Sequence, residues 1–435
     1  MSAFMDSLLM QDLMAVSFGE EDFEDYEEAS SVSTQMQMEE EPEEEEEEDD
    51  EDQLSRGQQR AANIDRRRGN FFNSERVSFP KTPCATSYEK ILQLPERTFR
   101  KYFHLNQESA LRLVHMLLGY DPTRRMTIEA HANALHNFLI AFHYFSTGEY
   151  DFSLEPEHLR CNSFDQFNQP LMVVKCIIVN IAQIIAQQKR YLSFSKSTKM
   201  QRHLVEGFEQ NFGIKHTLGC IDCLHVSIAE PCKEPYKYLN RHKYESLNVE
   251  AICDSNLMFL SVRIFPGSNS DCYSFSKSPI RDNLYDTLSN KCFDVKTINW
   301  LLSDLAYPVD TFLVTPYEKP QRDYERAFNE LHMRVFDGTI KRALELVRTT
   351  FKCLLKHKQI DFEPKEASYI VRACFVLYNI LLNQGNIDFD SDVFEVDDMA
   401  ECYTNFKIKN VKNCPMGEEA RSIYAKTLVR NSFKS

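Results

Sequence analysis

Five short apolar runs in the second half of the chain limit the folds that it can adopt. They read GCIDCLHVSIA, LNVEAICD, LMFLSVRIFPG, INWLLSDLAY and TFLVTPY, in this order from Gly219 to Tyr317. Apolar runs of this length, rich in β-branched residues and bounded by turn residues, are typical of β-strands. The second and third runs flank Ser255 and Asn256, which predicts a two-stranded hairpin. The chain is therefore expected to build a β-sheet in this region.

Helical periodicity surrounds these runs on both sides. From about Ser87 to Phe212, apolar residues recur at helical spacing, and Leu171–Gln188 is the most apolar of these segments. After the strands, a long helix is predicted over Tyr324–Leu355, followed by a second at SYIVRACFVLYNILLNQ and a short final one at GEEARSIYAKTLVRN. Because such helices pack on the sheet, the predicted fold is α/β: a mixed sheet covered by helices and preceded by an all-helical domain.

The N-terminal region is dominated by acidic residues. The first 52 residues hold 22 Asp and Glu and no Lys or Arg, and Glu39–Asp52 is almost wholly acidic. Like charges repel along such a run, so residues 1–75 are expected to be a disordered, solvating tail rather than a lure for basic partners such as histones. A basic patch near its end is a candidate nuclear-localisation signal or DNA-contacting arm: Arg66, Arg67 and Arg68. Removing the 22 acids leaves 44 against 50 bases, which permits a polyanionic partner.

Changes in composition divide the chain into four parts. The acidic tail covers residues 1–75, a helical domain 76–215, the sheet-containing domain 216–385 and a polar C-terminal extension with a short helix 386–435. An eroded helix-turn-helix is conceivable within residues 148–169, and its second helix would need basic or amide side chains aimed at base edges. This stretch offers Gln166, Asn168, Gln169 and one lysine, and Pro170 interrupts it. A structural helical layer is the favoured interpretation.

Cysteine usage and hydropathy indicate the compartment. The 13 cysteines are scattered singly, as is typical of reduced thiols in the cytosol or nucleus. The first residues lack the basic region of a signal peptide. The segment from Leu171 contains Lys175 and is too short and too polar to span a bilayer. A soluble intracellular protein without a membrane partner is expected.

The first apolar run carries an aspartate inside a predicted strand. Side chains alternate along a strand, so Cys220 and Asp222 point to one face, and Cys223 and His225 to the other. The two thiols therefore do not share a zinc ion, and no second cysteine pair of suitable spacing follows. A carboxylate in such a strand is costly unless it has a partner or binds a metal ion.

A second aspartate, Asp304, ends the run INWLL at the tip of another predicted strand. Two aspartates on neighbouring strands are the ingredients of a site that holds Mg²⁺ or Mn²⁺ and activates water against a phosphodiester. Asp254 and Asp271 are further acids close to these strands in sequence. Spacing alone does not separate this interpretation from a satisfied residue at a strand end.

Six motifs follow one another in a recognisable order. They are GCIDCLHV, YLNRHKYESLNVEAICD, FPGSNSD, WLLSDLAYP with TFLVTPY, FNELHMRVFDGTIKRALELVRTTFKCL and RACFVLYNILL. This order resembles the PIF/Harbinger transposases and the Harbinger transposase-derived nucleases, over about Phe99 to Asn383. The resemblance implies a ribonuclease H-like core, a DDE superfamily endonuclease site with Mg or Mn as divalent cation, and DNA as ancestral substrate. It also implies location in the nucleus, with the cytoplasm as a second location, and a Myb/SANT-like DNA-binding partner protein.

The resemblance assigns roles position by position. Asp222 matches the first catalytic aspartate of the family and Asp304 the second. The third catalytic residue of the family is a glutamate on a helix, and the anchors Ile340 and FKCL put Lys341 at its position. Other family motif positions carry no assigned chemical role; they are Asn240, Arg241, Ser246, Asn248, Asp254, Pro266, Gly267, Ser268 and Asp271. His225 matches a family histidine, whereas two other family histidines are replaced, by Ser270 and Tyr378.

The lysine changes the chemistry that the site can support. An ammonium group at Lys341 repels divalent cations and attracts Asp222 and Asp304. At about 4 Å, opposite unit charges gain roughly 4 kcal/mol at an effective dielectric near 20, so a metal ion must displace the lysine. We predict a domesticated transposase-derived protein that associates with DNA or chromatin and whose cleavage activity is reduced or lost.

Two other interpretations stay open. The first is an active metal-dependent DNA endonuclease with a different third ligand. Glu345 lies one helical turn beyond Lys341, and a register shift of one turn could bring it into the site. Alternatively, Asp254 or Asp271 could complete the site. The second is a protein–protein adaptor without DNA contact. The candidates for DNA contact are Arg66, Arg67, Arg68, Arg241 and Lys243.

Overall fold

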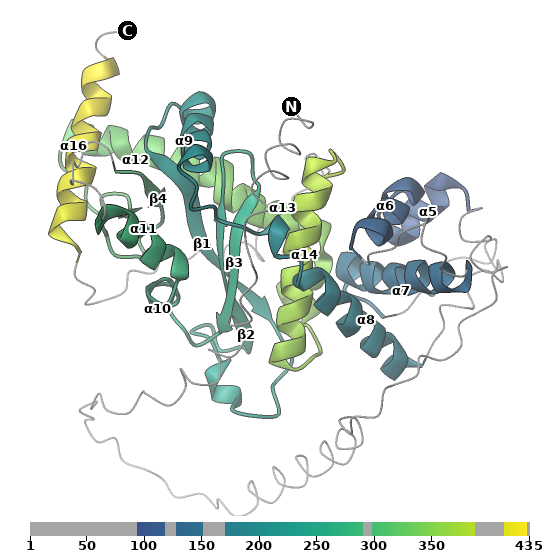
Figure 1. Ribbon diagram of the computed structural model, residues 1–435. Helices are drawn as coiled ribbons and strands as arrows, with labels where there is room; N and C mark the ends of the chain where they lie inside the picture. Colours follow the sequence, from purple (N-terminus) through teal and green to yellow (C-terminus); the bar gives the residue numbers. More distant parts are fainter. Residues whose placement is uncertain (1–93, 118–127, 151–169, 290–297, 388–412, 433–435) are drawn as a thin grey trace, which may run out of the picture. The chain divides into compact units, whose positions relative to one another are not determined.

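The apolar runs after Gly219 form a five-stranded mixed sheet, as the sequence predicts (Figure 1). The strands are β1 (Thr217–Ser227), β2 (Ser246–Cys253), β3 (Phe259–Pro266), β4 (Trp300–Leu302) and β5 (Leu313–Val314). Their order in the sheet is β3-β2-β1-β4-β5. The β1–β2 and β2–β3 pairs are antiparallel, whereas the β1–β4 and β4–β5 pairs are parallel. The sheet and its covering helices have the architecture of a ribonuclease H-like core.

The computed structural model describes residues 94–117, 128–150, 170–289, 298–387 and 413–432. The predicted acidic tail with Arg66, Arg67 and Arg68, and residues 151–169 of the predicted helix-turn-helix, lie outside this part of the chain. The helices before the sheet are α5 (Glu96–Phe103), α6 (Gln107–Leu117), α7 (Ile128–Thr147), α8 (Leu171–Ala186) and α9 (Thr198–Phe212). The helices after β3 are α10 (Asp271–Ser276), α11 (Pro279–Ser289), α12 (Asp323–Phe336), α13 (Arg342–Thr350), α14 (Pro364–Asn383) and α16 (Pro415–Ser432). Short 3₁₀ turns are η4 (Lys189–Tyr191), η5 (Pro235–Lys237), η8 (Lys352–Leu354) and η9 (Lys356–Lys358).

The predicted hairpin is confirmed and joins β2 to β3. Its turn is closed by Asp254, whose Oδ1 accepts hydrogen bonds from the backbone N–H groups of Asn256 at 2.8 Å and Met258 at 2.9 Å. Leu257 takes the left-handed conformation that such a tight turn requires, with φ of 67°. Asp254 is thereby committed to the turn and does not face the acids of the other strands.

The two faces of β1 enter different cores, as the predicted alternation requires. Cys220 and Leu224 pack in the larger core with residues of α12, α13 and α14. Ile221 and Cys223 pack in the smaller core with residues of α10 and α11. Figure 1 shows α10 and α11 on one side of the sheet and α13 and α14 on the other. The thiols of Cys220 and Cys223 therefore lie on opposite faces.

The single long helix predicted over Tyr324–Leu355 is wrong in one respect, because a π-helical turn, η7 (Asp337–Lys341), separates α12 from α13. Thr339 is fully buried there, and its hydroxyl donates a 2.7 Å hydrogen bond to the carbonyl of Val335. A π-helical turn accommodates one extra residue, and such turns occur often at functional sites. Hydropathy does not reveal it, because the buried face continues through both helices.

Helix α14 joins the sheet to the helices that precede it. The side chain of Asn379 bonds both backbone groups of Phe259 in β3, at 2.9 Å and 2.7 Å, and donates to the carbonyl of Tyr191 at 2.7 Å. Arg372 donates to the carbonyls of Ala186 in α8 and Val262 in β3. Buried amide and guanidinium groups thus satisfy backbone groups at the edge strand β3 and at the ends of the neighbouring helical segments.

The C-terminal helix α16 is longer than the short helix that the sequence predicts, and it packs beside β5. Arg421 is buried and donates to the carbonyls of Thr315 and Pro316, both at 3.0 Å. Tyr424 contacts Trp300 with ring centroids 5.1 Å apart. This packing covers the end of the sheet at which β4 and β5 lie.

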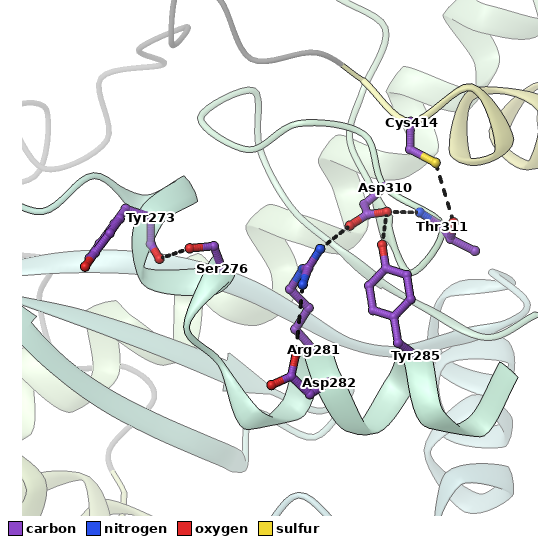
Figure 2. Close-up of polar contacts among 8 residues, drawn as sticks. All are labelled: Tyr273, Ser276, Arg281, Asp282, Tyr285, Asp310, Thr311 and Cys414. Atoms are coloured by element: carbon purple, nitrogen blue, oxygen red, sulfur yellow. Dashed lines mark hydrogen bonds and ion pairs between the residues drawn. The ribbon is translucent and has the colours of Figure 1, made fainter. Parts of the chain in front are cut away.

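A polar network holds the loop between β4 and β5 (Figure 2). Asp310 accepts hydrogen bonds from the hydroxyl of Tyr285 at 2.5 Å and from the backbone N–H of Thr311 at 2.7 Å. Its other oxygen lies 3.8 Å from the guanidinium of Arg281 on α11. The hydroxyl of Thr311 lies 3.7 Å from the sulfur of Cys414, just before α16. This loop is therefore held by α11 and by the C-terminal segment.

Across the described ranges, none of the helices combines the length and the apolar character that a bilayer crossing requires.

Candidate functional site

The first predicted catalytic residue, Asp222, lies in the middle of β1 and is only 7% exposed. Its Oδ1 accepts a 2.8 Å hydrogen bond from the backbone N–H of Cys223. Burial raises the pKa of Asp222 well above its usual range, and the charge of Asp304 raises it further. This carboxyl group is therefore kept in an environment that opposes its ionisation.

The second predicted residue, Asp304, is brought beside Asp222 by the parallel pairing of β1 and β4. Cys220 pairs with Leu302, and each aspartate follows its member of this pair by two residues. The Oδ1 of Asp304 accepts a 2.9 Å hydrogen bond from the backbone N–H of Ala306. Burial and then the charge of Asp271 raise the pKa of Asp304 to about 6. The two aspartates thus form one coupled acidic pair.

Lys341, which stands where the resemblance expects glutamate, ends the π-helical turn near this pair. Its ammonium lowers the pKa of both Asp222 and Asp304, so its charge acts on the site. Its Nζ also lies 3.5 Å from Oδ1 of Asp337, four residues earlier in the same turn. The lysine therefore shares its charge between the acidic pair and an acid of its own helix.

Glu345, the predicted substitute ligand, has a different partner. Its Oε2 lies 2.8 Å from Nη1 of Arg342, and its side chain is 14% exposed. Arg342 is therefore an ion-pair partner of Glu345, and the side chain of Glu345 is largely buried. Glu345 is not among the groups that shift the pKa of Asp222 or Asp304.

A second cation lies near the pair, on the loop between β1 and β2. Arg241 lowers the pKa of Asp304, and its Nε donates to Nε2 of His242 at 3.3 Å. His225 bonds the hydroxyl of Ser246 through Nδ1 at 3.0 Å, and burial lowers its pKa to about 4, so it is neutral at pH 7. Lys243, the other predicted DNA-contact residue of this loop, is exposed.

Two further acids lie on the other face of β1, around α10. Asp271, named from the sequence only as an alternative, raises the pKa of Asp222, Asp304 and Glu250 and is thus the acid common to both groups. Glu250 on β2 is missed by the sequence reasoning. A signal was present, because Asn248 and Glu250 alternate with apolar residues and must share one face of a buried strand.

The residues present do not fit a two-ion site of the DDE type. Such a site needs three carboxylates around the metal ions, and the third position holds the cation of Lys341. Within the described ranges, no three His, Cys, Asp or Glu side chains are grouped so that they could hold a metal ion. The arrangement of Asp222 and Asp304 with Lys341 and Arg241 is instead that of a charge-balanced acidic pair.

Residues 221–379 match the family described as DDE superfamily endonuclease. The proteins named "Putative nuclease HARBI1" from Rattus norvegicus and Homo sapiens are 27% and 26% identical to the chain over 213 residues. Each of these alignments covers 48% of this chain and 59% of the relative, so the chain spans about three fifths of the relatives' length. The Xenopus laevis protein of the same name is 26% identical over 220 residues, 50% of this chain and 61% of the relative. No solved structure matches the chain.

Proposed function

We propose that this chain, in which residues 221–379 match the DDE superfamily endonucleases, is a domesticated Harbinger transposase-derived protein that binds DNA or chromatin and has lost strand cleavage. DDE superfamily endonucleases typically use divalent metal ions. The proposal rests on one observation, the ammonium of Lys341 acting on Asp222 and Asp304 from the helix where the third carboxylate is expected. A cation there opposes the ions that this chemistry requires.

The residues of the site act on one another in a way that keeps the fold stable without metal ions. Asp222 and Asp304 are both buried, and the charge of Asp304 disfavours the ionised form of Asp222. Lys341 and Arg241 offset this repulsion. The same two cations lower the electrostatic attraction of the pair for a divalent ion, so the stable apo form and the loss of cleavage have the same cause.

The partners and the compartment belong to the same proposal. A DNA-binding role is supported by Arg241, which acts on Asp304, by the exposed Lys243 of the same loop and by the basic patch near the end of the acidic tail. A nuclear location and a Myb/SANT-like partner protein are what the family relationship suggests. If the chain were an adaptor without DNA contact, its affinity for DNA would not depend on salt.

Supercoiled-plasmid nicking in Mg²⁺ or Mn²⁺ tests the loss of cleavage. The full chain is expected to nick no faster than its Asp222→Ala variant. Nicking by the unaltered chain that Asp222→Ala abolishes would instead establish an active endonuclease. That second candidate is favoured by one observation, the action of Asp271 on both aspartates, because it offers a third acid from α10. In that case Asp271→Asn, and not Glu345→Gln, should remove the activity.

A further inference from the structure

Three oxygen atoms behind the acidic pair are buried without a hydrogen-bond partner. They are Oδ1 of Asn248 and both carboxyl oxygens of Glu250. Asn248 is 0% and Glu250 1% exposed, so neither side chain turns to solvent for its missing bonds. Burying such acceptors without a partner costs free energy, and buried polar groups in native proteins are nearly always satisfied. These oxygens therefore point to something that they hold.

The backbone brings the three oxygens together on one side of the sheet. Asn248 and Glu250 are two residues apart on β2 and so share a face. Glu250 pairs with Cys223 across the strands, which places it on the α10 side, opposite to the face of Asp222. The amide of Asn248 donates through Nδ2 to the carbonyl of Asn269 at 2.9 Å and to Oδ1 of Asp271 at 3.1 Å. Because the amide nitrogen of Asn248 donates both of these hydrogen bonds, its amide oxygen is available to bind a ligand on the same side of the sheet.

Asp271 supplies the second carboxylate of this group. It begins α10, is partly exposed, and acts electrostatically on Glu250. The group accordingly consists of a buried amide oxygen, a buried carboxylate and a carboxylate with access to solvent. Amide and carboxylate oxygens are the ligands that hard divalent cations prefer, and the exposed side of Asp271 gives such an ion a way in.

The neighbouring cation does not satisfy these oxygens. Arg263 stands opposite Glu250 on β3 and lowers its pKa, so it contributes some charge balance. Its guanidinium is directed elsewhere, because Nη1 donates to the carbonyl of Lys277 at 2.6 Å and the group lies 4.9 Å from the ring centre of Phe265. The carboxylate of Glu250 therefore lies within the field of a positive charge but has no hydrogen-bond partner.

We propose that Asn248, Glu250 and Asp271 bind one divalent cation, of the Mg²⁺ or Mn²⁺ type, on the α10 face of the sheet. The site is separate from the Asp222–Asp304 pair, which lies across β1. It goes beyond the proposed function and does not depend on it, since a cation here has a structural role whether or not the chain cuts DNA. It is also consistent with the lack of a group of three His, Cys, Asp or Glu side chains in the described part of the chain, because one ligand is an amide.

Mn²⁺ binding to the full chain, measured by calorimetry and by the electron paramagnetic resonance of the free ion, tests this site. The unaltered chain is expected to bind one ion, and Glu250→Gln and Asp271→Asn are each expected to weaken binding at least tenfold. Glu230→Gln, which removes an exposed acid just beyond β1, is the matched control and should bind as the unaltered chain does. The double variant Asp222→Asn with Asp304→Asn should also keep the ion.

A second measurement guards against a variant that simply unfolds. Mn²⁺ should raise the melting temperature of the unaltered chain above its value in EDTA, and should not do so for Glu250→Gln, whose fold is verified by circular dichroism. The proposal is overturned if the unaltered chain binds no Mn²⁺, which would leave ordered water as the partner of these oxygens. It is equally overturned if Glu250→Gln binds Mn²⁺ normally, or if binding is lost in the Asp222→Asn, Asp304→Asn variant alone.

Discussion

The acids on the two faces of β1 differ in how well neighbouring groups satisfy their charges and hydrogen bonds. On the face of α12 and α13, Asp222 and Asp304 each accept a backbone hydrogen bond and lie within the field of Lys341 and Arg241. On the face of α10, the carboxyl oxygens of Glu250 have no hydrogen-bond partner. The difference teaches that neighbouring cations and backbone donors can offset buried acids on one side of a strand while buried oxygen atoms on the other side have no hydrogen-bond partner.

The largest expected effect is a gain of metal binding at Asp222 and Asp304, on the face of α12 and α13. Lys341→Glu replaces a cation with a carboxylate and should add Mn²⁺ binding at Asp222 and Asp304, with an affinity at least 100-fold above that of the parent. Calorimetry should be done in a Glu250→Gln background, so that only this face is measured. Lys319→Glu, an equal charge change at an exposed residue beyond β5, should add nothing. Equal gains in both variants would show that overall charge, and not the position of Lys341, governs binding.

The second effect concerns the pH dependence of the protein's stability that arises from Glu250, on the face of α10. Burial raises the pKa of Glu250 to about 7, from a usual value near 4.5. The folded state therefore holds a proton that the unfolded state releases, so stability falls as the pH rises from about 4.5 to 7. In EDTA, Glu250→Gln should remove this loss and stabilise the protein by up to about 3 kcal/mol at pH 8, with no difference at pH 4.

Urea unfolding of the two proteins across this pH range measures the effect of Glu250. Asp271 and Arg263 are the charged groups that act on Glu250, and both are unchanged in this comparison. A variant that is less stable than the parent at pH 8 would mean that Glu250 already has a partner in solution without metal.

The third effect tests which charged residues shift the pKa of Asp304, on the face of α12 and α13. Lys341→Met should raise the pKa of Asp304 above about 6, because the ammonium now lowers it. Asp271→Asn should lower the same pKa, because the Asp271 charge raises it. Carboxyl carbon chemical shifts followed over a pH titration report both changes. Shifts of the same sign in the two variants would contradict the arrangement.

The smallest effect is on DNA binding. If Arg241 contacts phosphate, Arg241→Gln should weaken binding and reduce the slope of log affinity against log salt by about 1. Lys243→Gln should act in the same way. Lys319→Gln serves as the control with an unchanged slope, and fluorescence anisotropy at several salt concentrations provides the measurement.

Much of this arrangement could be predicted from the sequence. Alternation along β1 gave the opposite faces of Cys220 and Cys223, and apolar runs gave the hairpin and the strand that precedes Asp304. These features follow from the two-residue period of a strand and from the burial of its apolar side chains. Both can be recognised from the residues of one segment.

The rest depends on contacts that no local pattern contains. The π-helical turn at Lys341 arises from the packing of Thr339 and Ile340 against the sheet, and the helical period runs through it unchanged. The pairing of Glu345 with Arg342 is a choice among several nearby charges. That the side-chain oxygens of Asn248 and Glu250 lack hydrogen-bond partners can be recognised only when the positions of all neighbouring donors are known.

The most direct test of this account is the anomalous diffraction of manganese in crystals of the unaltered chain soaked in Mn²⁺. The account predicts a single peak bounded by Asn248, Glu250 and Asp271, and none between Asp222 and Asp304. One or two peaks between Asp222 and Asp304, with Lys341 displaced from them, would contradict it.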